Sequence, residues 1–162
     1  MRKILQNSAL MLLALACLPA LAQASNRTAY SASTEGQVLV LLNGIRHDHG
    51  LSTLTGSTAL RNAARSHSSD MLERAYFEHD SPGEGFGSRI RRYLKSPLVG
   101  ENIAWGTGRY GTASGIVTLW MHSPAHRHVI LMAGLHRVGL GIATGRFRGA
   151  EGAVMTTADF SS

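Results

Sequence analysis

The stretch Val138-Gly139-Leu140-Gly141-Ile142-Ala143 decides the fold class, because its large apolar side chains recur at every second residue. Alternation with a period of two is typical of a β-strand. The same period returns from Val154 to Phe160. The glycine-rich segment 144–152 between the two stretches predicts an antiparallel hairpin with a longish loop.

Upstream of this hairpin the apolar period becomes helical. The pattern predicts a helix from near Glu35 to His49, stopped by Gly50, and another that begins at Ser57 or Thr58 and reaches beyond Met71. Further helices are expected over about 112–121 and 123–132, the latter with Ser as cap and Pro at its first position. Seven glycines and two prolines between residues 78 and 112 predict mostly loop there. Helices first and strands last indicate an α+β fold, with helices covering the sheet.

The N-terminus has the layout of an export signal. Arg2 and Lys3 precede an apolar run, 9–21, that ends in Ala22-Gln23-Ala24. This run is shorter than the ~20 apolar residues of a membrane-spanning helix, so we expect a signal peptide over 1–24 that is cleaved before Ser25. A lipoprotein anchored through Cys17 is the less favoured alternative, because no leucine lies three residues before it. We expect a secreted protein, extracellular or periplasmic, with a flexible leader over 25–34 and one domain over 35–162.

Composition bears on the presence of disulfides and on the class of binding partner. Cys17 is the single cysteine, so no disulfide is expected in the mature chain. The formal net charge is +6, to which Arg2 and Lys3 contribute two. The remaining arginines are scattered apart from Arg89-Ile90-Arg91-Arg92, and no nucleic-acid motif accompanies them. We therefore expect no nucleic-acid partner. We also expect a monomer whose partner is a small ligand or an envelope component.

Three segments could supply chemistry: Phe77–Pro82 with His79, Gly100–Ala104 with Glu101, and Ser123–Arg127 with His126. Two imidazoles and a carboxylate that met in space could hold Zn²⁺ or another divalent cation and leave one position for water. Their separation in the chain does not show whether they meet.

Other polar residues have alternative interpretations. His67 lies on the apolar stripe of its helix, which favours a buried core histidine over a ligand. His122 and His126 are four residues apart, but Pro124 between them argues against a helical zinc pair. Asn102 could orient a loop through its amide or contact a ligand, and both roles stay open.

Six motifs appear in order and carry a family resemblance. They are Asn43-x-x-Arg46, Ala64-x-x-His67-Ser68-x-Asp70-Met71, His79-x-Ser81-Pro82, Gly100-Glu101-Asn102-Ile103-Ala104, Trp120-Met121-x-Ser123-Pro124-x-His126-Arg127 and Val138-Gly139-x-Gly141. Over about residues 37–160 the chain resembles the bacterial branch of the CAP superfamily, the cysteine-rich secretory, antigen 5 and pathogenesis-related 1 proteins. The resemblance implies an α-β-α sandwich, with a small antiparallel sheet between helical layers and a large open cleft.

The resemblance also implies a cleft that carries two histidines and two glutamates. His79, Glu101 and His126 fall on three of these positions, with Asn102 beside them. Ser123 stands where animal and plant members have the second glutamate. The loss of one carboxylate should weaken cation binding and removes one candidate general base.

Two functions compete on this basis. The favoured one is a binding module that takes a lipid-like or sterol-like molecule, a peptide or a protein, with or without a divalent metal. The alternative is a metal-assisted, peptidase-like hydrolase that uses His79, Glu101 and His126. The sequence offers it no convincing nucleophile and base. A purely structural envelope role is the third and least favoured option.

Overall fold

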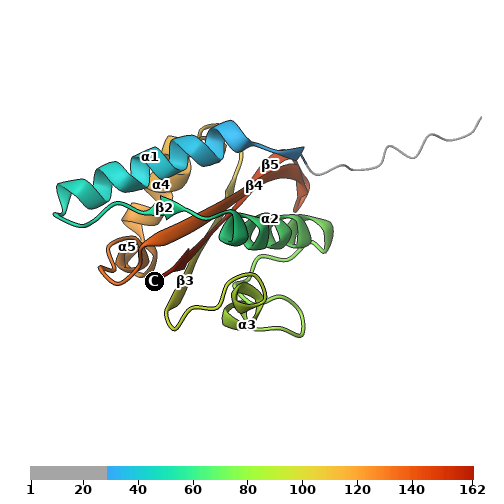
Figure 1. Ribbon diagram of the computed structural model, residues 1–162. Helices are drawn as coiled ribbons and strands as arrows, with labels where there is room; N and C mark the ends of the chain where they lie inside the picture. The colour runs from blue at the N-terminus through green and yellow to red at the C-terminus, as the bar shows by residue number, and fades with distance from the viewer. Residues whose placement is uncertain (1–28) are drawn as a thin grey trace, which may run out of the picture.

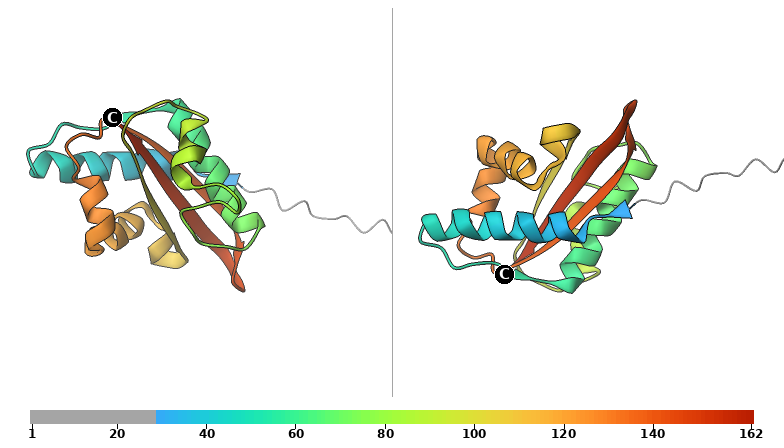
Figure 2. Two further views of the ribbon diagram at one scale, coloured as in Figure 1. Left: turned by 90° about the horizontal axis from the view of Figure 1, so that it is seen from below. Right: turned by 90° about the horizontal axis from the view of Figure 1, so that it is seen from above.

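The computed structural model describes residues 29–162, and its sheet lies between two layers of helices (Figure 1). In chain order the elements are β1 (Ala29–Tyr30), α1 (Ala32–Asp48), β2 (Thr55–Gly56), α2 (Thr58–Glu73), α3 (Phe86–Arg91), β3 (Val99–Gly106), the short 3-10 helix η1 (Gly108–Gly111), α4 (Ala113–His122), α5 (Pro124–Ile130), β4 (Arg137–Phe147) and β5 (Ala150–Ser161). The strand order is β1-β4-β5-β3, and β2 adds a short parallel pairing to β4. Helices α1, α4 and α5 cover one face, and α2 and α3 cover the other (Figure 2). The predicted α-β-α sandwich is confirmed.

The predicted signal peptide, its cleavage site and Cys17 lie outside the described residues. Among the helices that the structure does describe, none is long and apolar enough to cross a membrane.

The glycines of β4 allow α2 to lie directly on the sheet. A Cβ on Gly139 would come within 2.0 Å of the backbone of Leu60 and Arg61, and one on Gly141 within 2.2 Å of the backbone of Ala64. No side chain fits at either position, because real Cβ atoms do not approach backbone atoms that closely. The alternation in the sequence therefore separates a helix-contacting glycine face from an apolar face.

The apolar face of β4 forms the main core. Val138, Leu140 and Ile142 are buried against Leu42 of α1 and Trp120 of α4. A smaller cluster lies on the other face, around residues Met71, Phe147 and Met155. Burial of apolar surface on both sides stabilises a sheet sandwiched in this way.

Arg46 joins three segments of the α1 side without a carboxylate partner. It is fully buried, and burial lowers the pKa of its guanidinium. Its donors meet four backbone carbonyls, those of Ser52, Ile130, Met132 and Leu135. Nearby, the Asn43 amide makes two hydrogen bonds with the backbone of Leu54. The motif Asn43-x-x-Arg46 thus has a structural role: its two polar side chains hydrogen-bond to the backbone of neighbouring segments, and buried polar groups need such partners.

Three sequence expectations are corrected. Segment 78–112, expected to be mostly loop, contains α3 and the eight-residue strand β3. The glycines of this segment suggest loop, but the middle residues of β3 are buried and pair with β5. Within the expected leader 25–34, Ala29–Tyr30 pairs with β4 and α1 begins at Ala32. The hairpin turn is short, because Arg148 and Gly149 both adopt positive φ, at 48° and 84°, and β4 continues to Phe147.

Replacement of Gly141 by Ala should destabilise the fold strongly. The added methyl group would collide with the backbone of α2, so we expect a loss of at least about 2 kcal/mol of unfolding free energy in urea denaturation. Gly44→Ala is the matched control: Gly44 lies inside α1 with nothing within 4 Å of an added Cβ. That change should stabilise the protein by about 0.5–1 kcal/mol. Equal effects of the two changes would contradict the proposed contact.

Candidate functional site

The edge strand β3 positions the central carboxylate of the site. Glu101 lies directly opposite Asp159 of β5 in the antiparallel register. Both residues are buried, with 5% and 0% of their surface exposed. Arg89 of α3 is also buried and reaches both carboxylates. The two strands and α3 therefore concentrate three ionisable groups in the interior.

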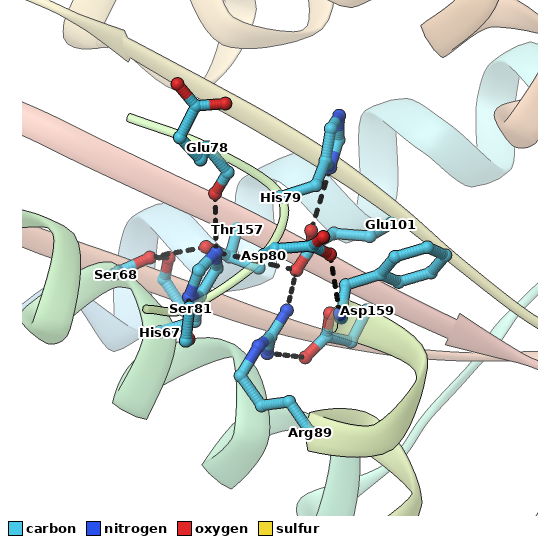
Figure 3. Close-up of polar contacts among 12 residues, drawn as sticks. His67, Ser68, Glu78, His79, Asp80, Ser81, Arg89, Glu101, Thr157 and Asp159 are labelled. Atoms are coloured by element: carbon cyan, nitrogen blue, oxygen red, sulfur yellow. Dashed lines mark hydrogen bonds and ion pairs between the residues drawn. The ribbon is translucent and has the colours of Figure 1, made fainter. Parts of the chain in front are cut away.

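Each oxygen of Glu101 has a separate partner (Figure 3). Oε1 lies 2.8 Å from Nδ1 of His79, and Oε2 accepts a hydrogen bond from Nη2 of Arg89. Arg89 also places Nη1 3.3 Å from Oδ2 of Asp159. Buried charges are tolerated only when they are paired and hydrogen-bonded, and here one guanidinium faces two carboxyl groups.

Because one guanidinium faces two carboxyl groups, the protonation of Asp159 is affected most. Burial, followed by the neighbouring charge of Glu101, raises the pKa of the Asp159 carboxyl well above its ordinary value, while Arg89 acts in the opposite direction. A raised carboxyl pKa means that the neutral form is favoured. The centre therefore consists of one guanidinium, Arg89, that contacts both Glu101 and an Asp159 whose neutral form is more favoured than in water.

His79 connects this buried centre to the surface. Its side chain is 46% exposed, and its second ring nitrogen points away from Glu101 (Figure 3). The hydrogen bond to Glu101 raises the pKa of His79. The His126 ring of α5 lies 6.5 Å away, centroid to centroid, and burial followed by the charge of His79 lowers its pKa. His79 thus has Glu101 as its hydrogen-bond partner and His126 as a neighbouring ring.

The three residues do not fit the expected metal site. Within residues 29–162, no group of three or more His, Cys, Asp or Glu side chains is placed to hold an ion. The cause lies in Glu101, whose oxygens are already engaged by His79 and by the Arg89 guanidinium. A carboxylate that pairs with one ring nitrogen of a histidine orients that ring, so Glu101 is not placed as a third ligand beside His79 and His126.

Asn102 and Trp120 fasten the other helical layer to the edge of β3. The Asn102 amide is fully buried and donates to the backbone carbonyl of His126 at 3.1 Å, in the manner of the loop-orienting role. The Trp120 indole donates to the carbonyl of Ile103 at 3.1 Å. Ser123 precedes α5 as its N-cap residue, without a side-chain capping bond. These contacts fix where His126 emerges.

Sequence reasoning missed Arg89 and Asp159. Arg89 stands in a basic cluster that is typical of a solvated surface, and nothing in that cluster distinguishes it from Arg91. Asp159 could have been identified, because it lies within the predicted second strand. A sheet covered by helices on both faces has no solvent-exposed face, so a charged residue in it must be buried and needs a partner.

Replacement of Glu101 by Gln should lower the pKa of His79, since the neutral amide replaces the carboxylate whose hydrogen bond and charge raise it. Because the folded-state pKa of His79 is raised, the pair stabilises the fold below the ordinary histidine value of about 6.5. That contribution is lost as the pH rises through the raised value. Glu101→Gln should therefore also flatten the pH dependence of stability in that window. NMR titration of the imidazole protons and urea denaturation across pH measure both.

Glu84→Gln is the control for this titration. It removes an equal charge from the same loop region, where Glu84 pairs with Arg92 at 2.9 Å near the surface. The pKa of His79 should not respond to that change. An unchanged pKa in Glu101→Gln would contradict the proposed pairing.

Comparison with known proteins places this architecture in a family. The family model of the cysteine-rich secretory protein family, CAP, matches residues 39–160. The chain is 34% identical over 129 residues to the uncharacterized protein YkwD of Bacillus subtilis, a match that covers 76% of this chain and 49% of YkwD. The uncharacterized membrane protein YlbC of the same species is 33% identical over 112 residues, covering 68% of this chain and 32% of YlbC. The chain thus spans half or less of the length of these relatives.

Solved structures agree on the fold. An extracellular protein of Bacillus anthracis that contains an SCP domain superimposes with a TM-score of 0.68 at 28% identity, over 80% of this chain and 40% of that one. An outer surface protein of Borrelia burgdorferi gives 0.73 at 17% identity, over 83% and 96% of the two chains. With the matched family model, these similarities show that the chain belongs to the cysteine-rich secretory protein (CAP) family.

Proposed function

We propose that this chain is a secreted, monomeric binding module that takes up a small lipid-like ligand in an apolar groove between α1 and α4. The signal-like N-terminus and the extracellular relative from Bacillus anthracis support secretion. The observation that carries the binding proposal is the groove itself, with a volume of about 680 Å³. It is lined by Ser33, Gly36, Gln37, Val40, Leu41 and Thr112–Ser114.

The groove has features of a ligand site. Its volume falls in the range of roughly 300–1,000 Å³ that is usual for small-molecule sites. Val40 is 71% exposed and Leu41 38%, although both are large apolar side chains. Contact with a ligand would remove this surface from water. A second pocket of about 370 Å³ shares Thr112 and Ser114 and adds the cationic Arg109, which suits a polar headgroup.

This location differs from the cleft expected around His79. The groove is formed by α1 and the start of α4, and none of His79, Glu101, Asn102, Ser123 or His126 lines it. A sterol or a peptide would compete for the same apolar surface and is distinguished by the binding test.

Val40→Asp should weaken binding of the fluorescent fatty acid cis-parinaric acid at least tenfold, because a carboxylate would enter the apolar groove. The measurement is fluorescence titration of the purified mature protein, with cholesterol and an apolar peptide as competitors. Leu119→Asp is the matched control: Leu119 is an exposed apolar residue of α4 that does not line the groove. Absence of probe binding, or equal losses in both variants, would contradict the proposal.

The pair formed by Glu101 and His79 favours a second candidate, hydrolysis without a metal ion. Glu101 faces Nδ1 of His79, so a neutral His79 that donates its Nδ1–H keeps an unprotonated Nε2. A histidine whose tautomer is fixed by a buried carboxylate is suited to act as a general base. His79 would take a proton from water, Glu101 would stabilise the imidazolium, and the neutral His126 would donate to the developing oxyanion.

Slow hydrolysis of p-nitrophenyl acetate tests this candidate. Both His79→Gln and Glu101→Gln should lower kcat/KM by about a hundredfold, the usual contribution of a general base. His128→Gln is the control, because exposed histidines also react with this ester. A chelator should leave the rate unchanged. Rates that are equal in wild type and His79→Gln would eliminate the candidate.

A further inference from the structure

One imidazole of α2 holds the loop on both sides of His79. His67 is buried, with 1% of its surface exposed. Its Nε2 lies 3.0 Å from the carbonyl oxygen of Glu78, and its Nδ1 lies 3.3 Å from Oγ of Ser81. Glu78 directly precedes His79, and Ser81 follows it by two residues. The short loop segment that carries His79 is therefore attached to α2 at two points.

The contacts define the protonation state of this ring. The Glu78 carbonyl can only accept, so Nε2 carries a proton and donates it. The hydroxyl of Tyr76, 3.4 Å from Nδ1, donates to Asp70, so the Ser81 hydroxyl is left to donate to Nδ1. In a doubly protonated ring Nδ1 would carry a proton and could no longer accept the hydrogen bond from Ser81. Burial lowers the pKa of His67, which agrees with a neutral ring.

We propose that His67 is a positioning residue for His79: its neutral ring fixes the backbone at Glu78 and Ser81 and thereby aims Nδ1 of His79 at Glu101. Figure 3 shows the Glu101 carboxylate between the two imidazole rings, with His67 below the carbonyl of Glu78. Nε2 of His67 lies 3.9 Å from Oε2 of Glu101, beyond a hydrogen bond, so its influence passes through the loop. This inference rests on the pair of Glu101 and His79 in the second candidate function.

The test reads the tautomer of His79 and not only stability. Ring-nitrogen NMR shifts of labelled protein, measured at a pH where His79 is neutral, report which nitrogen carries the proton. Wild type should show the Nδ1–H form. His67→Phe removes both loop contacts at similar volume, so we expect the Nδ1–H form to be lost, as in Glu101→Gln. His67→Gln keeps a donor near the position of Nε2 and should retain part of it.

Ser68→Ala is the matched control. Ser68 is the next residue of α2, is fully buried, and bonds to the carbonyl of Gly141 and the hydroxyl of Thr157. Its loss should reduce stability without changing the tautomer of His79. Ser81→Ala removes one loop contact alone, and a reduced Nδ1–H fraction in that variant supports the proposal even if His67→Phe does not fold.

The outcomes separate the two ideas. If wild type lacks the Nδ1–H form, the pair of Glu101 and His79 fails, and this inference fails with it. If Glu101→Gln changes the tautomer while folded His67→Phe and Ser81→Ala both keep it, only the positioning role is overturned.

Discussion

The contact between the backbone of α2 and β4 is the constraint on which the rest of the structure depends. It exists because Gly139 and Gly141 have no side chains, and the Ser68 hydroxyl reinforces it by donating to the Gly141 carbonyl at 2.8 Å. With α2 fixed on the sheet, His67 is fixed as well. The loop segment that His67 contacts carries His79, so the packing of α2 against one strand bears on where the His79 imidazole lies.

The second determinant is the pairing of buried charge at the sheet edge. Glu101 is stable in the interior because Arg89 and His79 engage its two oxygens, and isolated buried carboxylates are costly. The edge of β3 is covered by the helical layer that contains α4, where the Trp120 indole donates a hydrogen bond to the Ile103 carbonyl. His79 and His126, which come from opposite sides of the sheet, meet at this edge.

Much of the fold could be predicted from the sequence, because its signals are local. The alternation in β4 and the stripe of α2 depend only on residue spacing, and both elements formed as predicted. β3 was missed because its glycines suggest loop, while its long-range pairing with β5 decides otherwise. The sequence singled out His79, Glu101 and His126. It could not show that Arg89 pairs with Glu101, because nothing in the sequence of a basic cluster tells which of its arginines is buried.

The presence of Arg89 changes the chemistry that suits this site. Ser123 already replaces one carboxylate of the family pattern, and the remaining one is neutralised by a guanidinium. The two imidazoles therefore face little uncompensated negative charge, which disfavours hard cations such as Ca²⁺ and Mg²⁺, because these are held by carboxylate and carbonyl oxygens. What remains is the His79 imidazole, oriented by Glu101, with the His126 ring 6.5 Å away between centroids. The apolar groove and this pair are connected along the chain: α4 begins at the groove wall with Ala113 and is followed, after Ser123, by α5, which carries His126. The groove wall at Ala113 and His126 thus lie on two consecutive helices, α4 and α5, which Ser123 separates.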